Sequence, residues 1–207
     1  MATTPSETSI ANAALTILGE RRINSLDDTS KTAKTLKERY AEVRDEVLRS
    51  HPWNFATKRA SLAADLTTPL WGPKNAFTLP SDSLRLLRIN NPSDIPYRIE
   101  GRKIVSDLEA PLEIVYTAQE ADPLQMDSLF RQALSAALAA DVAEAITGST
   151  TMVETANAIL TAKMRQARVP DGQEPSPPQI IAGEWLDSRE EHGNTLDRVP
   201  SGTGTPL

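Results

Sequence analysis

The sequence alternates between stretches with helical periodicity and one long stretch with strand-like patterning. Apolar residues recur every three or four positions over residues 4–19, 30–49, 122–148 and 151–168, which predicts four α-helices. Between the second and third of these, residues 54–121 hold short β-favouring runs separated by prolines. This order predicts an α+β, mainly α fold, in which an antiparallel helical bundle carries an inserted antiparallel β subdomain and an extended C-terminal tail.

Polar residues and glycines mark the ends of the predicted helices. Thr4, Pro5 and Glu7 have the spacing of an N-cap, a first helical position and a capping-box carboxylate, and Gly19 supplies a stop. The segment Asp122-Pro123-Leu124-Gln125 repeats the combination of cap and proline before the third helix. Gly148 ends that helix, and Thr151 with Glu154 forms a possible capping box for the last one, so the final two helices are expected to form an antiparallel hairpin.

The second predicted helix has one apolar stripe and one highly charged face. The face carries six basic and four acidic residues between Lys31 and Arg49, spaced for i,i+4 pairs such as Lys34 with Glu38. Such a face is typically solvated, and the alternative is a contact surface for a subunit or partner that uses charge to set its register. The stripe consists of Ala33, Leu36, Tyr40, Val43, Val47 and Leu48.

The middle of the chain predicts four or five short antiparallel strands in a small sheet or barrel-like subdomain. A hairpin is expected to turn at Gly101, between two runs that alternate in polarity. The best strand candidates are Leu84–Ile89, Tyr97–Glu100, Lys103–Ser106 and Leu112–Thr117.

The stretch from His51 to Phe55 separates the helical pattern from the strand pattern. Pro52 lacks an N–H and disfavours helical backbone at His51, so the preceding helix should end near Ser50. Trp53 and Phe55 follow at once in a chain that is only 4% aromatic. We interpret His51, Pro52, Trp53 and Phe55 as a structural anchor that fixes the helix end against the core.

The composition changes after Val169. Prolines cluster over residues 170–178, and a short apolar island follows that contains Ile180, Ile181, Trp185 and Leu186 within an acidic tail. Such an island is expected to bind either the protein's own body or a partner, and the pattern leaves both open. The resulting divisions are residues 1–53, 54–121, 122–168 and 169–207.

Composition excludes several classes of protein. The chain has no cysteine, which excludes disulfides, thiol nucleophiles and cysteine-ligated metal sites. Its net charge of −6 does not favour a protein that binds nucleic acid mainly through contacts with the phosphate groups. No apolar run is long enough to span a bilayer, and the residues up to Ile10 lack the basic start of a signal peptide.

No pattern of catalytic, cofactor-binding or metal-ligating residues is present in the sequence. Its two histidines, His51 and His192, are far apart, and neither belongs to a metal motif. Phosphate-binding glycine loops and nucleophile elbows are also missing. We therefore expect a protein without enzymatic activity or cofactors. A hydrolase would require carboxylates that only the fold brings together.

Short motifs follow one another along the chain in a fixed order. They are Ala14-Leu15-Thr16-Ile17-Leu18-Gly19-Glu20, Ile23-Asn24-Ser25-Leu26, Leu48-Arg49-Ser50-His51-Pro52-Trp53-Asn54-Phe55-Ala56, Arg59-Ala60-Ser61-Leu62, Phe77-Thr78-Leu79-Pro80-Ser81-Asp82-Ser83-Leu84-Arg85, Tyr97-Arg98-Ile99-Glu100-Gly101, Phe130-Arg131-Gln132-Ala133-Leu134 and Glu184-Trp185-Leu186-Asp187-Ser188-Arg189. This ordered series resembles the tail tubular protein A family, the head-to-tail adaptors of short-tailed and related bacteriophages. The resemblance covers about residues 8–190, although the Pro-rich residues 170–178 and the short Gly/Thr end depart from the family's pattern.

The resemblance implies a virion protein made in the host cytoplasm and located at the head-to-tail junction. Identical subunits, twelve in number, would form a ring between the portal protein and a downstream tail or nozzle protein. DNA would pass through the lumen without sequence-specific contact, and an acidic lumen would let it slide. We expect Ile180, Ile181, Trp185, Leu186 and Arg189 to contact the portal or a neighbouring subunit. The alternative function is a small cytoplasmic helical binding module or regulator.

Overall fold

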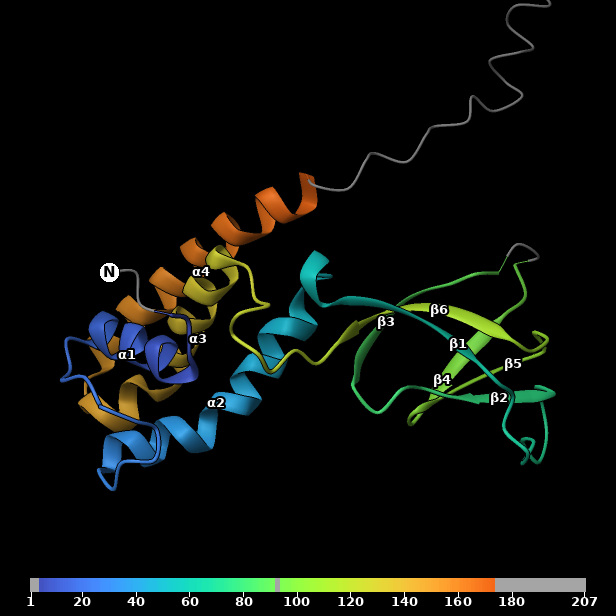
Figure 1. Cartoon of the computed structure of the whole chain (residues 1–207), viewed down its shortest axis with the longest axis horizontal. Coiled ribbons are helices and arrows are strands. Elements are labelled where there is room, and N and C mark those ends of the chain that lie inside the picture. Colours follow the sequence, from blue (N-terminus) through green and yellow to red (C-terminus); the bar gives the residue numbers. More distant parts are fainter. Residues whose placement is uncertain (1–3, 92–93, 174–207) are drawn as a thin grey trace, which may run out of the picture. The chain divides into compact units, whose positions relative to one another are not determined.

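The computed structural model describes residues 4–91 and 94–173, which form an α+β fold of four α-helices and two small antiparallel sheets (Figure 1). Two helices, α1 (Glu7–Leu18) and α2 (Lys31–Ser50), precede the strands. Two more, α3 (Ser128–Thr147) and α4 (Thr150–Gln173), follow them. We refer to the helices as the helical part and to residues 57–118 as the strand part.

The first helix is capped by Ser6, so the predicted cap at Thr4 is wrong. The Ser6 hydroxyl accepts the Ser9 backbone N–H at 3.1 Å, and the Ser9 hydroxyl accepts the Ser6 N–H at 2.9 Å. Two serines thus form the reciprocal box that was expected to need Glu7, and Pro5 lies outside the helix. Gly19 ends the helix with a φ of 72°, a left-handed conformation that glycine adopts without strain, as predicted.

Helix α2 buries its whole predicted apolar stripe, but the expected i,i+4 ion pairs are not the ones that form among the described residues. Instead, Arg39 pairs with Glu42 and also donates to both carboxylate oxygens of Asp141 in α3, at 2.8 and 2.9 Å. A two-pronged arginine–carboxylate contact is stronger than a single exposed pair, so the contact with Asp141 is the stronger of the two that Arg39 makes. Part of the charged face is therefore used within the chain.

Helix α3 is the central helix, because it contacts α1, α2 and α4. Its buried residues lie around most of its circumference, and many are alanines that allow close approach of the neighbouring helices. The helix begins at Ser128 with Asp127 as its cap, so the start predicted at Asp122 is wrong. The carboxylate of Asp122 instead accepts the Leu124 N–H at 2.9 Å and forms a separate turn.

Helix α4 packs beside α3, as the predicted hairpin requires, and it continues to Gln173 through Pro170. The sequence predicts an end at Arg168, so the helix is longer than expected by more than one turn. Its first turn is capped by Ser149, whose hydroxyl accepts the Met152 N–H at 3.3 Å. The contacts that stabilise the extra turn lie at the junction with the strands and are described below.

The strand part contains six strands among the described residues, so the prediction of four or five was too low. The hairpin at Gly101 is present, and that glycine has a φ of 61°. One sheet has the order β1-β6-β3 and the other β2-β5-β4. The strands are β1 (Thr57–Leu62), β2 (Asn75–Thr78), β3 (Ser83–Ile89), β4 (Tyr97–Glu100), β5 (Lys103–Ser106) and β6 (Leu112–Ala118).

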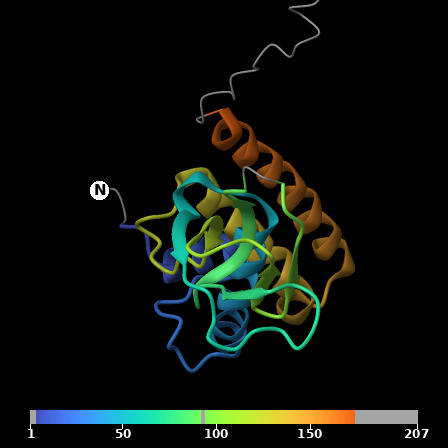
Figure 2. The same ribbon diagram turned by 90° about the vertical axis from the view of Figure 1, so that its right-hand side faces the viewer.

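The two sheets share a second apolar core that is separate from the helical one. Figure 2 shows the ribbon with the strands toward the viewer. Leu112 and Ile114 contribute to it from one sheet, and Phe77 and Ile104 from the other. All four side chains are buried to 98% or more, since none is more than 2% exposed. The strand part is therefore a packed unit with its own interior and not a loose insertion.

Two aspartates tie the strand part together, and both have lowered pKa values. The Asp82 carboxylate accepts hydrogen bonds from Lys58 and Tyr116, each at 3.1 Å. Burial alone would raise the pKa of Asp82, but these two hydrogen bonds lower it by more. The ion pair with Lys103 at 2.7 Å lowers the pKa of Asp65, burial opposes this, and the Thr78 hydroxyl lowers it further.

These two carboxylates should make the strand part sensitive to acid. A carboxyl group whose pKa is lower in the folded chain stabilises the fold above its unfolded pKa of about 3.9, and that contribution is lost as pH falls through the folded pKa. We expect the double variant Asp65→Asn/Asp82→Asn to be less stable than the wild type in urea at pH 7. The difference should become smaller as the pH is lowered below about 3.9.

A control for this prediction is the variant Glu100→Gln/Glu109→Gln, which changes two exposed carboxylates of the same region. It should match the wild type at pH 7 and at pH 2.5. An equal loss of stability at pH 7 and pH 2.5 in the aspartate variant would contradict an electrostatic role.

Candidate interaction site at the helix–strand junction

The junction is built by the residues that follow helix α2. His51 ends the helix in an extended conformation, with φ −147° and ψ 146°, and Pro52 follows it. The chain then forms the short 3-10 helix η1 (Asn54–Ala56) and enters β1. Pro52 is exposed, whereas Trp53 turns inward and is only 1% exposed.

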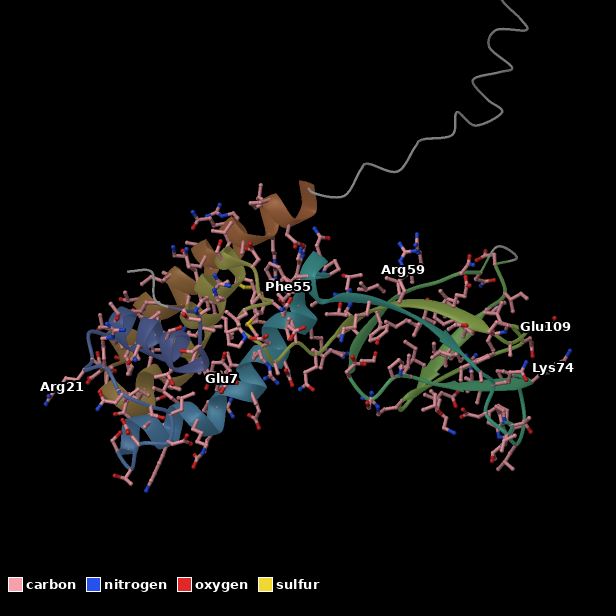
Figure 3. All side chains as sticks on the ribbon, in the orientation of Figure 1. Glu7, Arg21, Phe55, Arg59, Lys74 and Glu109 are labelled. Atoms are coloured by element: carbon pink, nitrogen blue, oxygen red, sulfur yellow. The ribbon has the colours of Figure 1, made fainter. Side chains whose placement is uncertain are left out.

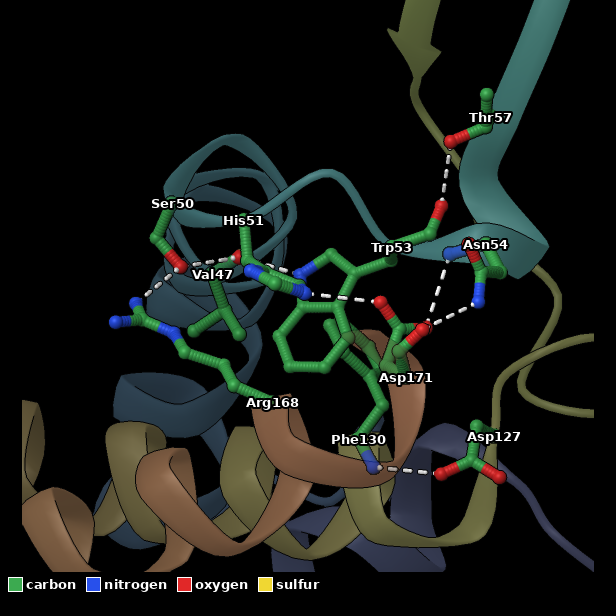
Figure 4. Close-up of polar contacts among 10 residues, drawn as sticks. All are labelled: Val47, Ser50, His51, Trp53, Asn54, Thr57, Asp127, Phe130, Arg168 and Asp171. Carbon is green, nitrogen blue, oxygen red and sulfur yellow. Dashed lines mark hydrogen bonds and ion pairs between the residues drawn. The ribbon is translucent and has the colours of Figure 1, made fainter. Parts of the chain in front are cut away.

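Trp53 is the centre of an aromatic cluster (Figure 4). Its ring packs edge to face with the ring of His51, at a centroid distance of 4.7 Å, and with the ring of Phe130, at 5.0 Å. Phe55 packs against Phe130 at 4.9 Å, so the cluster joins the end of α2 to the start of α3. The indole N–H donates to the Val47 carbonyl at 3.0 Å, which satisfies the one polar atom of the buried ring.

Asp171 contributes to the junction, although the sequence pattern assigns it to the tail. One of its carboxylate oxygens lies 2.9 Å from His51 Nε2, and the other accepts the Asn54 backbone N–H at 3.0 Å. The Asn54 side chain donates to the Asp171 carbonyl at 2.7 Å. These contacts hold the last turn of α4 despite Pro170, which cannot donate to the preceding turn.

No sequence motif predicts a partner for His51, but the fold provides one. Asp171 is the residue that sequence reasoning missed, and it lies 120 positions away in the chain. A local pattern does not reveal such a pair. In the described part of the chain, Asp171 is the only side chain hydrogen-bonded to the His51 ring. With its other side against Trp53, the imidazole serves to bind α4 to the end of α2.

Three further contacts connect helix α2 to the strand part. Arg49 donates to the Leu84 carbonyl, and Arg85 donates to the Arg49 carbonyl at 3.4 Å. Gln119, just after β6, donates to Asp45 at 2.6 Å. The strands are thus joined to the helical part by polar contacts around the end of α2 as well as by the chain itself.

The strand part also exposes large apolar side chains. Leu66, Leu70 and Trp71 lie in the loop between β1 and β2 and have exposed fractions of 105%, 100% and 83%. We call residues 66–71 the apolar loop. Tyr97 and Ile99 of β4 are about half exposed, at 44% and 52%. Scattered exposed apolar residues are ordinary, but three in six positions make this loop a candidate contact surface.

The proposed contact residues of the tail, Ile180, Ile181, Trp185, Leu186 and Arg189, lie outside the described residues. Within residues 4–91 and 94–173, no group of three or more histidines and carboxylates is placed to hold a metal ion. Among the helices of that same portion, none is long and apolar enough to cross a membrane. The absence of cysteine applies to the whole sequence.

No protein-family model matches the sequence, and no curated protein matches it.

Proposed function

We propose that this protein is a head-to-tail adaptor of a bacteriophage, a structural virion protein without enzymatic activity. The proposal is supported by the ordered motifs of the sequence and by the order of the elements along the chain, in which all the strands come after one pair of helices and before the other. Two of those motifs meet at the junction, where Trp53 packs on Phe130. Motifs that are distant in sequence and adjacent in space belong to one structural unit.

In this proposal the helices form an antiparallel bundle that packs between neighbouring subunits of a twelve-membered ring. The strand part faces the downstream tail or nozzle protein, and the C-terminal tail contacts the portal ring or an adjacent subunit. DNA passes through the lumen without sequence-specific contact. A net charge of −6 suits such a lumen, because repulsion of phosphate lets DNA slide.

The observation that carries the proposal is the apolar loop. Burying a leucine or tryptophan side chain stabilises an assembly by roughly 1.5–3 kcal/mol, and aromatic residues are enriched at the centres of protein interfaces. A free-standing loop with Leu66, Leu70 and Trp71 exposed gains that stabilisation only when another surface covers it. An assembly protein at a multi-protein junction provides such a surface.

The first test is mass photometry of the purified protein, alone and mixed with the portal protein of the same phage. We expect a small species alone and a portal-bound ring in the mixture. Failure to bind the portal would refute the adaptor function. A small oligomer of fixed size bound to a cytoplasmic partner would instead favour the regulator.

The apolar loop gives a separate prediction. The triple variant Leu66→Ser/Leu70→Ser/Trp71→Ser should still join the portal but should capture the downstream tail protein at least tenfold less well, since a few buried anchors carry most of an interface's affinity. Pull-down on assembled portal rings measures this loss. As a matched control, Leu124→Ser changes an apolar side chain that is 57% exposed and lies outside the loop. Unchanged capture by the triple variant would remove the loop from the interface.

A further inference from the structure

The sheet β1-β6-β3 carries an open groove of about 570 Å³ on the face opposite the apolar core. Val115 of β6 lies at its centre and is half-buried, whereas its neighbours Ile114 and Tyr116 point into the core. Strand register pairs Val115 with Arg59 on one side and with Arg88 on the other. Both arginines are exposed and line the groove.

The two arginines have no ion pair or hydrogen bond among the described residues. Some other cations of the strand part do have one, such as Lys58 with Asp82 and Lys103 with Asp65. Two strand spacings separate the Arg59 and Arg88 backbones by roughly 10 Å. In Figure 3 the Arg59 side chain projects away from β1. Two unpaired cations this close favour an anionic group between them.

The groove also contains one carboxylate, and its position limits what can bind. Glu113 lies two residues from Val115 on the same face of β6, a step of roughly 6.8 Å, and its Oε2 accepts the Asn90 side-chain N–H at 2.8 Å. A nucleic-acid backbone, with negative charge at every phosphate, would place like charge against Glu113. The groove therefore favours a ligand with an anionic group followed by a cationic one.

We propose that the groove binds residues 185–191 of the chain's own C-terminal segment. Residues 174–207 contain six acidic and two basic residues, and the stretch from Asp187 to Glu191 alternates acidic, basic and acidic at every second position. In an extended chain every second side chain lies on the same side, at intervals of roughly 6.8 Å. Asp187 then lies between Arg59 and Arg88 while Arg189 reaches Glu113.

The length of the chain allows this contact within one molecule. Asp171 is hydrogen-bonded to Asn54, so the described chain ends beside the start of β1. Arg59 is only five residues beyond Asn54, a span of at most about 18 Å. The sixteen residues from Asp171 to Asp187 reach up to about 55 Å when extended. The inference concerns the protein before it meets a portal ring, when residues 185–191 have no other partner, and it does not depend on the adaptor function.

Cross-linking between introduced cysteines tests the contact, because the chain has no cysteine of its own. Ser61, which pairs with Glu113 in the register and lines the groove, is changed to cysteine together with Ser188. A short bismaleimide should join the two in the full-length protein. A product within one chain and a product between two copies both support docking of the segment, and mass spectrometry separates them. The control pair, Thr161→Cys with Ser188→Cys, places the first thiol on the exposed side of α4 and should give little product.

Charge reversal tests the specificity of the contact. We expect Arg59→Glu/Arg88→Glu to lower the cross-linking yield of the cysteine pair by roughly tenfold, which corresponds to the loss of a few charge contacts. Asp187→Arg in the same chain should restore a large part of the yield, because Asp187 is the residue placed between the two arginines. The matched control Arg21→Glu/Arg98→Glu makes the same change in net charge at two other exposed arginines and should leave the yield unchanged.

Two outcomes would overturn the proposal. One is a cross-linking yield of the Ser61→Cys/Ser188→Cys pair that does not change on charge reversal, or that equals the yield of the control pair. The other is that a duplex DNA oligonucleotide binds the wild type but not the variant Arg59→Glu/Arg88→Glu, while the two proteins give the same cross-linking yield. The groove would then bind nucleic acid and not the C-terminal segment. All of these experiments use the purified protein without portal, so a failure of the adaptor function leaves their interpretation unchanged.

Discussion

Replacement of Trp53 by alanine is expected to lower the free energy of unfolding by about 3–5 kcal/mol, the usual cost of truncating a buried tryptophan. The ring is 1% exposed and contacts both His51 and Phe130, so its removal leaves a cavity between the end of α2 and the start of α3. The lost hydrogen bond adds little, because the Val47 carbonyl also accepts the Ser50 hydroxyl at 2.8 Å. Most of the loss should therefore come from packing.

The chain offers a matched control for this variant. Trp71 is 83% exposed, so Trp71→Ala should change the free energy of unfolding by less than about 0.5 kcal/mol. Urea unfolding followed by far-ultraviolet circular dichroism compares the two variants with the wild type. A Trp53→Ala protein as stable as Trp71→Ala would show that the junction does not hold the fold together.

The helices were the most predictable elements, because their periodic apolar stripes are long and unambiguous. Every residue of the α2 stripe is buried, and both glycine stops, Gly19 and Gly148, adopt the left-handed conformation. The caps were less predictable, since several short polar residues competed for each start. At α1 the pair of Ser6 and Ser9 prevailed over Thr4 and Glu7.

The strands were predicted where apolar residues alternate and missed where they do not. Strand β1 was missed because its outer side carries Arg59 and Ser61, while Leu62 is its only buried residue. Strand β2 is four residues long, too short for a pattern to stand out. Both find their place by pairing with distant strands, β1 with β6 and β2 with β5.

The junction was half predictable. The aromatic residues after α2 are conspicuous in the sequence, and Pro52 marks the end of the helix. The role of Asp171 could not be predicted from the sequence, because its two partners are more than a hundred positions away. In addition, Pro170 beside it indicates the end of a helix. Only the tertiary contact with His51 and Asn54 makes that last turn of α4 favourable.

The position of Asp171 changes how the C-terminal tail should be removed. A chain ending at Arg168 loses the contacts of Asp171 as well as the tail, at a cost of about 1–3 kcal/mol for the unsatisfied polar groups. A chain ending at Gln173 keeps those contacts. Only the second truncation separates the stability of the folded part from the function of the tail.

We therefore expect the protein truncated after Gln173 to unfold in urea like the full-length chain but to lose binding to portal rings. Under the adaptor proposal, Ile180, Ile181, Trp185 and Leu186 contribute apolar contacts, each worth roughly 1.5–3 kcal/mol when buried, so their joint loss weakens binding by several orders of magnitude. Mass photometry with portal protein measures the loss. A full-length control, Ile180→Asp/Ile181→Asp, should fail in the same way. Rings that form normally on the truncated chain would show that portal binding resides in residues 1–173.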